Sequence, residues 1–203
     1  MRPTESPYNQ GLDQNTANHV ALSPLSFIER AAHVYPDRVA ILYGERRQTW
    51  RDTYTRSRQL AGALAARGVG KNDTVAVMLP NVPAMFEAHF GVPMAGAVLN
   101  TLNTRLDPEA IAFMLEHGEA KVLLTDREFA SVIAKALDLL QGPRPYVVEV
   151  EDDTAPAGAY LGDTSYEAFL ATGNPQYAWA LPPDEWDAIA LNYTSGTTGN
   201  PKG

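Results

Sequence analysis

The sequence contains no cysteine, and this absence removes several kinds of chemistry at once. A chain without thiols forms no disulfide, offers no thiolate ligand to a metal ion and has no cysteine nucleophile. A thioester intermediate on this segment is therefore impossible. Any thiol chemistry in which it takes part needs an external thiol.

The spacing of metal ligands is also missing. Four histidines are scattered along the chain, at positions 19, 33, 89 and 117, and none is paired with an acidic residue at metal-ligand spacing. We expect structural or surface roles for them, with His89 on a core or pocket wall because Phe86 and Phe90 flank it on a predicted helix. The acidic run Glu151-Asp152-Asp153 is more typical of a solvated loop than of a metal site.

Long apolar runs and excess positive charge are absent too. No stretch approaches the roughly 18 apolar residues that a membrane-spanning helix needs. The formal net charge of −8 argues against a nucleic-acid partner. A nucleotide-binding protein can still be acidic, because only the loop that binds the phosphates must attract them. Residues 1–20 are polar and do not resemble a signal peptide, so we expect a flexible tail there and a cytoplasmic protein.

The rest of the chain alternates between apolar runs and helical patterns. Strands are predicted at residues 39–43, 74–79, 97–99, 122–124 and 146–150, and helices at 24–36, 51–67, 82–92, 107–118 and 125–140. This alternation predicts an α/β fold with a mostly parallel sheet flanked by helices. A chain of 203 residues is long enough to build a core of its own. We expect one folded unit over residues 21–203.

Local signals refine several of these elements. Phe27, Ala31 and Val34 follow helical spacing and predict the buried face of the first helix. Pro93 should kink or end the helix that contains it. Asp107-Pro108-Glu109 has the form of a helix start, with Asp as the N-cap and Pro in the first turn. Thr125 and Glu128 have the spacing of a capping box.

The most informative segment closes the sequence, from Tyr193 to Gly203, and combines hydroxyls, glycines and one lysine directly after an apolar run. Glycines let the backbone approach an anion closely, and successive N–H groups form an anion-binding nest. Walker spacing fails, because four residues after Gly196 the chain reaches Pro201 and Lys202 is followed by glycine. The dinucleotide fingerprint fails as well. A Ser/Thr/Gly-rich turn without function remains the alternative.

This segment resembles the signature phosphate loop of the adenylate-forming superfamily, which includes acyl-CoA synthetases, luciferase and peptide-synthetase adenylation domains. The resemblance extends upstream, to Pro24–Ala32, Tyr35–Ala40, Thr49–Arg51 and the motif Gly96–Leu106. It is closest in style to short- and medium-chain acyl-CoA synthetases. It implies that residues 21–203 are part of the large N-terminal AMP-binding domain of such an enzyme, ending at the phosphate loop.

The resemblance also implies a reaction and a set of site residues. A carboxylate would attack the α-phosphorus of ATP, and coenzyme A would then displace AMP to give an acyl-CoA, with Mg²⁺ sharing the phosphate charge. The residues that match the family motif and would contact the triphosphate are Thr194, Ser195, Gly196, Thr197, Thr198, Gly199 and Lys202. The resemblance implies that the catalytic set of the family is not complete within this chain. The family's catalytic lysine, magnesium-binding motif and adenine pocket would follow Gly203, so we expect this chain alone to be inactive.

Several alternatives stay open at this point. The chain could belong to another adenylate-forming enzyme, such as an adenylation domain that loads a carrier protein. It could also be a non-catalytic nucleotide-binding protein, and a homo-oligomer is possible. The turn with Asn103, Thr104 and Arg105 follows a strand and could face a ligand. The simpler interpretation is that these residues bond to their own backbone.

Overall fold

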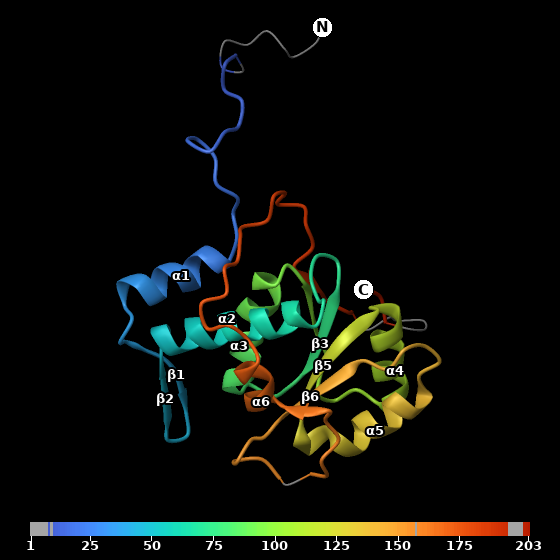
Figure 1. The fold of residues 1–203 in the computed structure, drawn as a ribbon. Helices are drawn as coiled ribbons and strands as arrows, with labels where there is room; N and C mark the ends of the chain where they lie inside the picture. Colours follow the sequence, from blue (N-terminus) through green and yellow to red (C-terminus); the bar gives the residue numbers. More distant parts are fainter. Residues whose placement is uncertain (1–7, 9, 157, 195–200) are drawn as a thin grey trace, which may run out of the picture.

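A six-stranded sheet, parallel throughout, forms the centre of the molecule in the computed structural model, which describes residues 8, 10–156, 158–194 and 201–203 (Figure 1). The strand order is β7-β6-β5-β3-β4-β8. The strands are β3 Thr74–Met78, β4 Val98–Thr101, β5 Ala120–Asp126, β6 Tyr146–Val150, β7 Thr164–Ser165 and β8 Ala190–Leu191. The predicted fold class, a mostly parallel sheet flanked by helices, is confirmed.

Helices cover both faces of this sheet. One face packs against α2 Trp50–Ala66, α3 Pro83–Met94 and α6 Tyr166–Ala171. The other face packs against α4 Pro108–His117 and α5 Ala130–Leu139. The short 3-10 helix η2 Arg127–Phe129 directly precedes α5. The sides alternate along a strand: Val75 and Val77 face the first layer, whereas Ala76 and Met78 face the second. Burial on both sides explains why the central strands are uninterrupted apolar runs in the sequence.

Outside the sheet, helix α1 Leu25–Val34 and the antiparallel hairpin of β1 Val39–Tyr43 and β2 Arg46–Thr49 precede α2. The predicted buried face of α1 is wrong. Leu25 and Ile28 are the buried residues of α1, whereas Phe27 is 64% exposed and Val34 is 51% exposed. A short helix can carry two apolar stripes, and here the stripe of Leu25 and Ile28 is the one that joins Ala61 of α2 and Met94 of α3 in a common cluster.

Two helix boundaries differ from the sequence expectation. Thr125 lies inside β5, and Asp126 caps the following turn instead, with Oδ1 accepting from the Glu128 N–H at 3.0 Å. The strand therefore continues one residue past Thr125, the expected N-cap. Helix α3 also runs one residue beyond Pro93 and ends at Met94. Proline lacks the backbone N–H and so costs the helix one hydrogen bond, here in its last turn. The start at Asp107 is confirmed, because its Oδ1 accepts from the Ala110 N–H at 2.8 Å.

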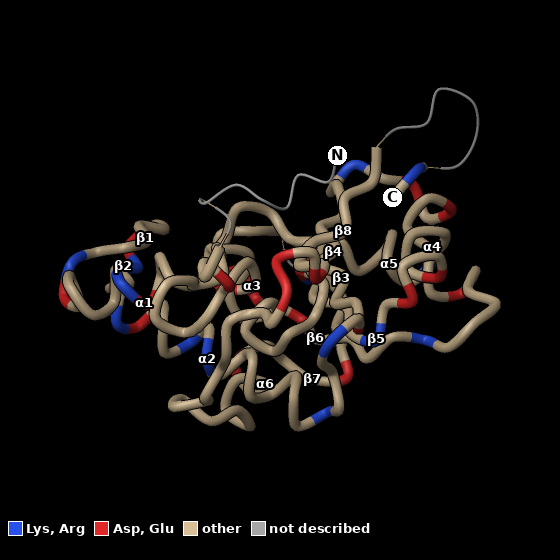
Figure 2. The backbone as a smooth tube through the Cα atoms, turned by 90° about the horizontal axis from the view of Figure 1, so that it is seen from above, with Lys and Arg blue, Asp and Glu red and all other residues tan. Residues whose placement is uncertain are grey.

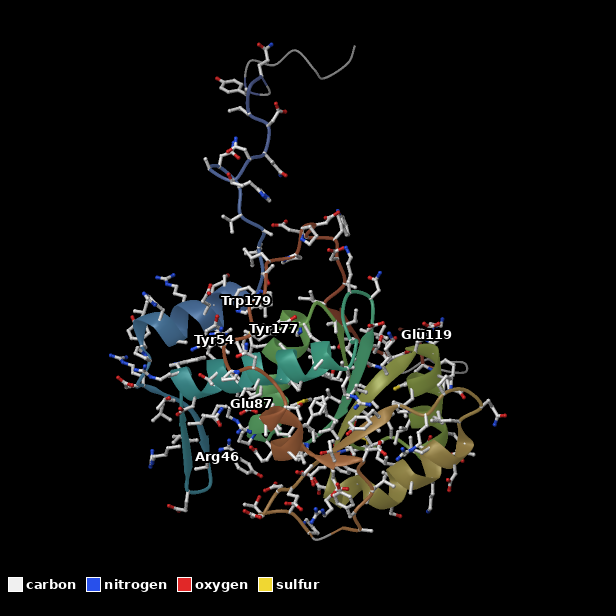
Figure 3. All side chains as sticks on the ribbon, in the orientation of Figure 1. Arg46, Tyr54, Glu87, Glu119, Tyr177 and Trp179 are labelled. Atoms are coloured by element: carbon white, nitrogen blue, oxygen red, sulfur yellow. The ribbon has the colours of Figure 1, made fainter. Side chains whose placement is uncertain are left out.

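A buried carboxylate ties four elements together on the α2 side of the sheet. Glu87 of α3 is fully buried and accepts from Gln48 Nε2 at 2.9 Å, Arg56 Nε at 2.6 Å and the Tyr166 hydroxyl at 2.7 Å (Figure 3). Burial, followed by the charge of Glu87, raises the pKa of Tyr166 well above its usual value. Tyr166 therefore stays a neutral donor. Three donors compensate the desolvated charge, and removing one of them would leave it buried and underpaired.

The segment after α6 crosses α2 and brings the chain to the far edge of the sheet. Tyr177 and Trp179 anchor it: Arg58 Nε donates to the Tyr177 carbonyl at 2.9 Å, and Trp179 Nε1 donates to the Tyr54 hydroxyl at 2.9 Å (Figure 3). Its start requires glycine, because a Cβ on Gly173 would lie 1.8 Å from the Gln59 carbonyl oxygen. This close crossing delivers β8 beside β4, next to the predicted phosphate loop.

The N-terminal residues lie apart from this body. Residues 10–22 contain no helix or strand and are largely exposed, and Figure 1 shows them extending away from α1. The Leu22 N–H donates to Glu185 Oε1 at 2.5 Å, where the chain joins the body. A flexible tail over 1–20 and a domain beginning at residue 21 stay predictions. Among the described residues, no helix is long and apolar enough to cross a membrane.

Candidate phosphate-binding site

The candidate site lies at the carboxyl end of an edge strand. Strand β8 pairs in parallel with β4, with Leu99 opposite Ala190 and Asn100 opposite Leu191. The loop from Tyr193 to Gly203 follows β8 directly. In parallel sheets, ligands bind beyond the carboxyl ends of the strands. The fold thus presents the loop where this class of sheet places its ligands.

The two ends of the loop are joined to each other. The Thr194 N–H donates to the Lys202 carbonyl at 2.9 Å, and the Lys202 N–H donates to the Thr194 carbonyl at 3.2 Å. Of the predicted site residues, Thr194 and Lys202 are thereby brought together. Ser195, Gly196, Thr197, Thr198 and Gly199 lie outside the described residues. The backbone N–H groups of Thr194 and Lys202 are engaged in this pair, and the Thr194 hydroxyl donates to the Lys202 carbonyl at 3.4 Å. Of these two residues, it is the Lys202 side chain that has no hydrogen-bond partner among the described residues.

Lys202 carries the positive charge of the site. Its side chain is exposed and forms no ion pair with any residue that the structure describes. Figure 2 shows basic residues around the hairpin β1–β2, at the opposite end of the molecule, and acidic residues along α4 beside the chain end. In an acidic protein, an unpaired lysine at this point is a local attraction for an anion.

Tyr193 anchors the start of the loop to α4. Its hydroxyl lies 2.8 Å from Nδ1 of His117, the last residue of that helix. Phe113, one turn earlier, stacks on His117 with ring centroids 5.3 Å apart and meets Tyr193 edge-on at 6.5 Å. Partial burial raises the pKa of Tyr193, so its hydroxyl stays protonated at neutral pH. The sequence did not predict this contact, because His117 and Tyr193 have no recognisable spacing.

Small residues let the strand and the helix end approach each other. A Cβ on Gly118 would lie 2.9 Å from the Met114 carbonyl oxygen and 3.3 Å from Leu191 Cδ2. Asn100, beside them on β4, is fully buried, and neither polar atom of its side chain has a partner among the described residues. The simple interpretation of the neighbouring turn is confirmed for Asn103, whose Oδ1 accepts from the Arg105 N–H at 2.9 Å.

The acidic run Glu151–Asp153 lies at a different part of the molecule. Among the described residues, no group of three or more His, Asp or Glu could hold a metal ion. The acidic segment instead borders a cavity of about 580 Å³ near the hairpin β1–β2, which Arg46 and Arg56 also line. Asp152 in this segment accepts from the Tyr43 hydroxyl. His89 is exposed and lines another depression, beside β1, as its expected pocket-wall position suggested.

Comparison with known proteins gives a family match over most of the chain. The sequence profile described as AMP-binding enzyme matches residues 28–203. The chain is 48% identical over 198 residues to a peroxisomal acetate/butyrate–CoA ligase of Arabidopsis thaliana, covering 92% of this chain and 35% of that protein. It is 47% identical over 201 residues to a peroxisomal trans-cinnamate:CoA ligase of Petunia hybrida, with the same two shares of 92% and 35%. The chain therefore spans about a third of the length of these relatives.

Solved structures agree on the fold. An anthranilate–CoA ligase in complex with anthranoyl-AMP superposes with a TM-score of 0.80 at 24% identity, covering 93% of this chain and 35% of that one. The N-terminal domain of a Mycobacterium tuberculosis protein named FACL13, in an inhibitor-bound structure, gives a TM-score of 0.71 at 25% identity, covering 88% and 42%. The arrangement of sheet and helices is thus shared with enzymes of this class.

Proposed function

This chain belongs to the family of AMP-binding enzymes, and from that membership we propose that it is part of an ATP-dependent acyl-CoA synthetase. Residues 21–203 would form part of the N-terminal AMP-binding domain. The observation that carries the proposal is the phosphate loop, which follows the carboxyl end of β8 and has its ends paired through Thr194 and Lys202. The coenzyme A ligases among the relatives favour this acceptor over a carrier protein.

The whole enzyme would join a carboxylic acid to coenzyme A in two steps. The carboxylate oxygen attacks the α-phosphorus of ATP, and the bond to the β-phosphate oxygen breaks to release pyrophosphate. The thiolate sulfur of coenzyme A then attacks the acyl carbon of the acyl-adenylate, and AMP leaves. The external thiol in this scheme agrees with a chain that has no cysteine of its own.

The loop would serve the first step by charge and position. An attacking carboxylate and a triphosphate repel each other, and the leaving pyrophosphate carries a high negative charge. Lys202 and the side-chain hydroxyls of the motif would neutralise and orient that charge, which lowers the barrier without any proton transfer. Mg²⁺ bound to the phosphates would share this task. The described residues offer it no acidic ligand cluster, so it would arrive on ATP.

The experiment measures pyrophosphate release from MgATP with acetate, butyrate, benzoate and trans-cinnamate, the acids in the names of the relatives. We expect turnover by the full-length protein and none by residues 1–203 alone. Robust turnover by the 203-residue chain would contradict the assignment of the remaining machinery to the rest of the enzyme.

Binding tests the loop itself. We expect residues 1–203 to bind MgATP weakly, with a dissociation constant above the micromolar range, because adenine and ribose are not held. Lys202→Gln should weaken this binding about tenfold, the scale of one charge-assisted hydrogen bond. Lys135→Gln on α5 is the matched control, because Lys135 is exposed and forms no ion pair with another described residue. Equal loss in both variants would argue against a phosphate role for Lys202.

Location and assembly belong to the same proposal. We propose a cytoplasmic enzyme, although several relatives carry peroxisomal in their names. Imaging a fluorescent fusion of the full-length protein decides between the two compartments. Light scattering of the same protein shows whether it forms a homo-oligomer.

A further inference from the structure

Both ends of the phosphate loop meet at the ring of Tyr193. Thr194, the next residue, pairs with Lys202 through two backbone hydrogen bonds. A Cβ on Gly203 would lie 2.8 Å from Cε1 and 3.0 Å from Cζ of the Tyr193 ring. The ring therefore packs directly on the backbone of Gly203. Whatever fixes this ring also fixes the point from which the loop leaves and the point to which it returns.

Helix α4 also contacts the ring. The Tyr193 hydroxyl lies 2.8 Å from His117 Nδ1, and the two rings meet edge-on with centroids 5.7 Å apart. Phe113 stacks on His117 and touches Tyr193 edge-on, so the imidazole is itself oriented. Helix α4 is a firm support, because Ile111 and Leu115 are buried against the sheet and α5.

The contact between His117 and Tyr193 can form with either assignment of donor and acceptor. Where Nδ1 carries no proton it accepts a hydrogen bond from the tyrosine hydroxyl, and where it carries one it donates to the tyrosine oxygen. His117 is not part of the loop motif, because it lies 76 residues before Tyr193 in the sequence.

We propose that His117, supported by Phe113, is a positioning residue for nucleotide binding. It holds the ring of Tyr193 and thereby positions the two ends of the loop, Thr194 and Lys202. The proposal rests on the proposed function, because it takes the loop to bind the triphosphate of ATP. His117 acts through Tyr193 and is assigned no contact with the nucleotide.

The test compares four single variants and one double variant, His117→Ala/Tyr193→Phe, of the 203-residue chain with the wild type. His117→Ala removes the imidazole that contacts Tyr193, and Tyr193→Phe removes the hydroxyl but keeps the ring. His117→Asn keeps a hydrogen-bonding atom close to the place of Nδ1. His33→Ala is the matched control, because His33 is also an exposed histidine in the last turn of a helix, α1. NMR titration with MgATP and with magnesium tripolyphosphate measures affinity, and hydrogen exchange at the amides of Thr194 and Lys202 measures how firmly the loop ends are held.

In His117→Ala and in Tyr193→Phe, we expect affinity to fall about three- to tenfold and exchange at both amides to accelerate by a similar factor. His117→Asn should recover most of both, and His33→Ala should match the wild type. The double variant His117→Ala/Tyr193→Phe should lose no more than either single variant, because both remove the same bond. The melting temperature of Tyr193→Phe should stay close to that of the wild type, which separates positioning from general stability.

Different results overturn the two proposals. If the wild type binds both triphosphates and the His117→Ala and Tyr193→Phe variants bind them equally well, with unchanged amide exchange, His117 does not position the loop. Fully additive losses of affinity in the double variant would also refute the proposal that His117 acts through its hydrogen bond to Tyr193. If the wild type binds neither triphosphate, the proposed function fails for this loop.

Discussion

Asp126 is a residue whose charge opposes folding. It is buried at the end of β5, its Oδ2 has no partner among the described residues, and burial followed by the nearby Asp152 and Glu149 raises its pKa. Because the folded state holds this proton to higher pH than the unfolded state, stability falls as pH rises from the ordinary aspartate value, about 4, through the raised pKa. Above that window, the full cost of the buried charge is present.

Asp126→Asn should therefore stabilise the protein at pH 7, by about 1 kcal/mol, the lower end of the cost of an unsatisfied buried group. The asparagine Oδ1 can still accept from the Glu128 N–H, so the cap is kept. The gain should shrink as pH falls toward about 4, where the wild type is protonated when folded. Urea unfolding across this pH range measures it. The control is Asp153→Asn, which changes an exposed aspartate in the acidic run Glu151–Asp153. An equal gain in stability from this control would refute the argument.

At the scale of single elements, the segment after α6 crosses α2 at very close range. A Cβ on Gly173 would meet three backbone atoms of α2, Gln59 O at 1.8 Å, Gln59 C at 2.7 Å and Ala63 N at 2.8 Å. The backbone of a helix cannot move aside as the end of a flexible side chain can. Gly173→Ala should destabilise the protein by about 2–3 kcal/mol, the range for forced overpacking.

Thermal and urea unfolding with tryptophan fluorescence check this prediction, since Trp179 lies on the displaced segment. Gly142→Ala is the matched control, because its nearest heavy atom would be Glu116 Oε1 at 3.9 Å. It should stay within about 0.5 kcal/mol of the wild type. Equal stability of the two variants would show that the crossing relaxes without cost.

Elements that depend on neighbouring residues were predictable from the sequence, and those that depend on distant contacts were not. The apolar run of β3 and the Asp107 cap of α4 are local signals, and both are confirmed. The buried face of α1 was missed because it is chosen by α2 and α3, which come later in the chain. The loop motif is also local, yet its anchor on His117 is not, because a hydrogen bond between residues so far apart leaves no periodicity.

At the scale of the whole molecule, apolar side chains remain uncovered on the side of α1 and the hairpin. Phe27 is 64% exposed, Leu42 is 65% exposed, and Val39 and Tyr35 lie between them in the chain with nearly half of their surfaces exposed. Large exposed apolar side chains gathered on neighbouring elements can mark a contact with other protein. The relatives are nearly three times as long as this chain, so we propose that further parts of the enzyme cover this side.

The isolated 203-residue chain should consequently self-associate as its concentration rises. Light scattering coupled to size-exclusion chromatography, run from about 10 µM upward, measures this. Leu42→Lys should reduce association, because it places a charge on the exposed strand β1, whose outer edge is open to pairing. Glu45→Lys, in the turn of the same hairpin, adds positive charge without removing apolar surface and should have less effect. A monodisperse monomer at every concentration would show that this surface is tolerated in water, and it would remove the argument that the rest of the enzyme covers it.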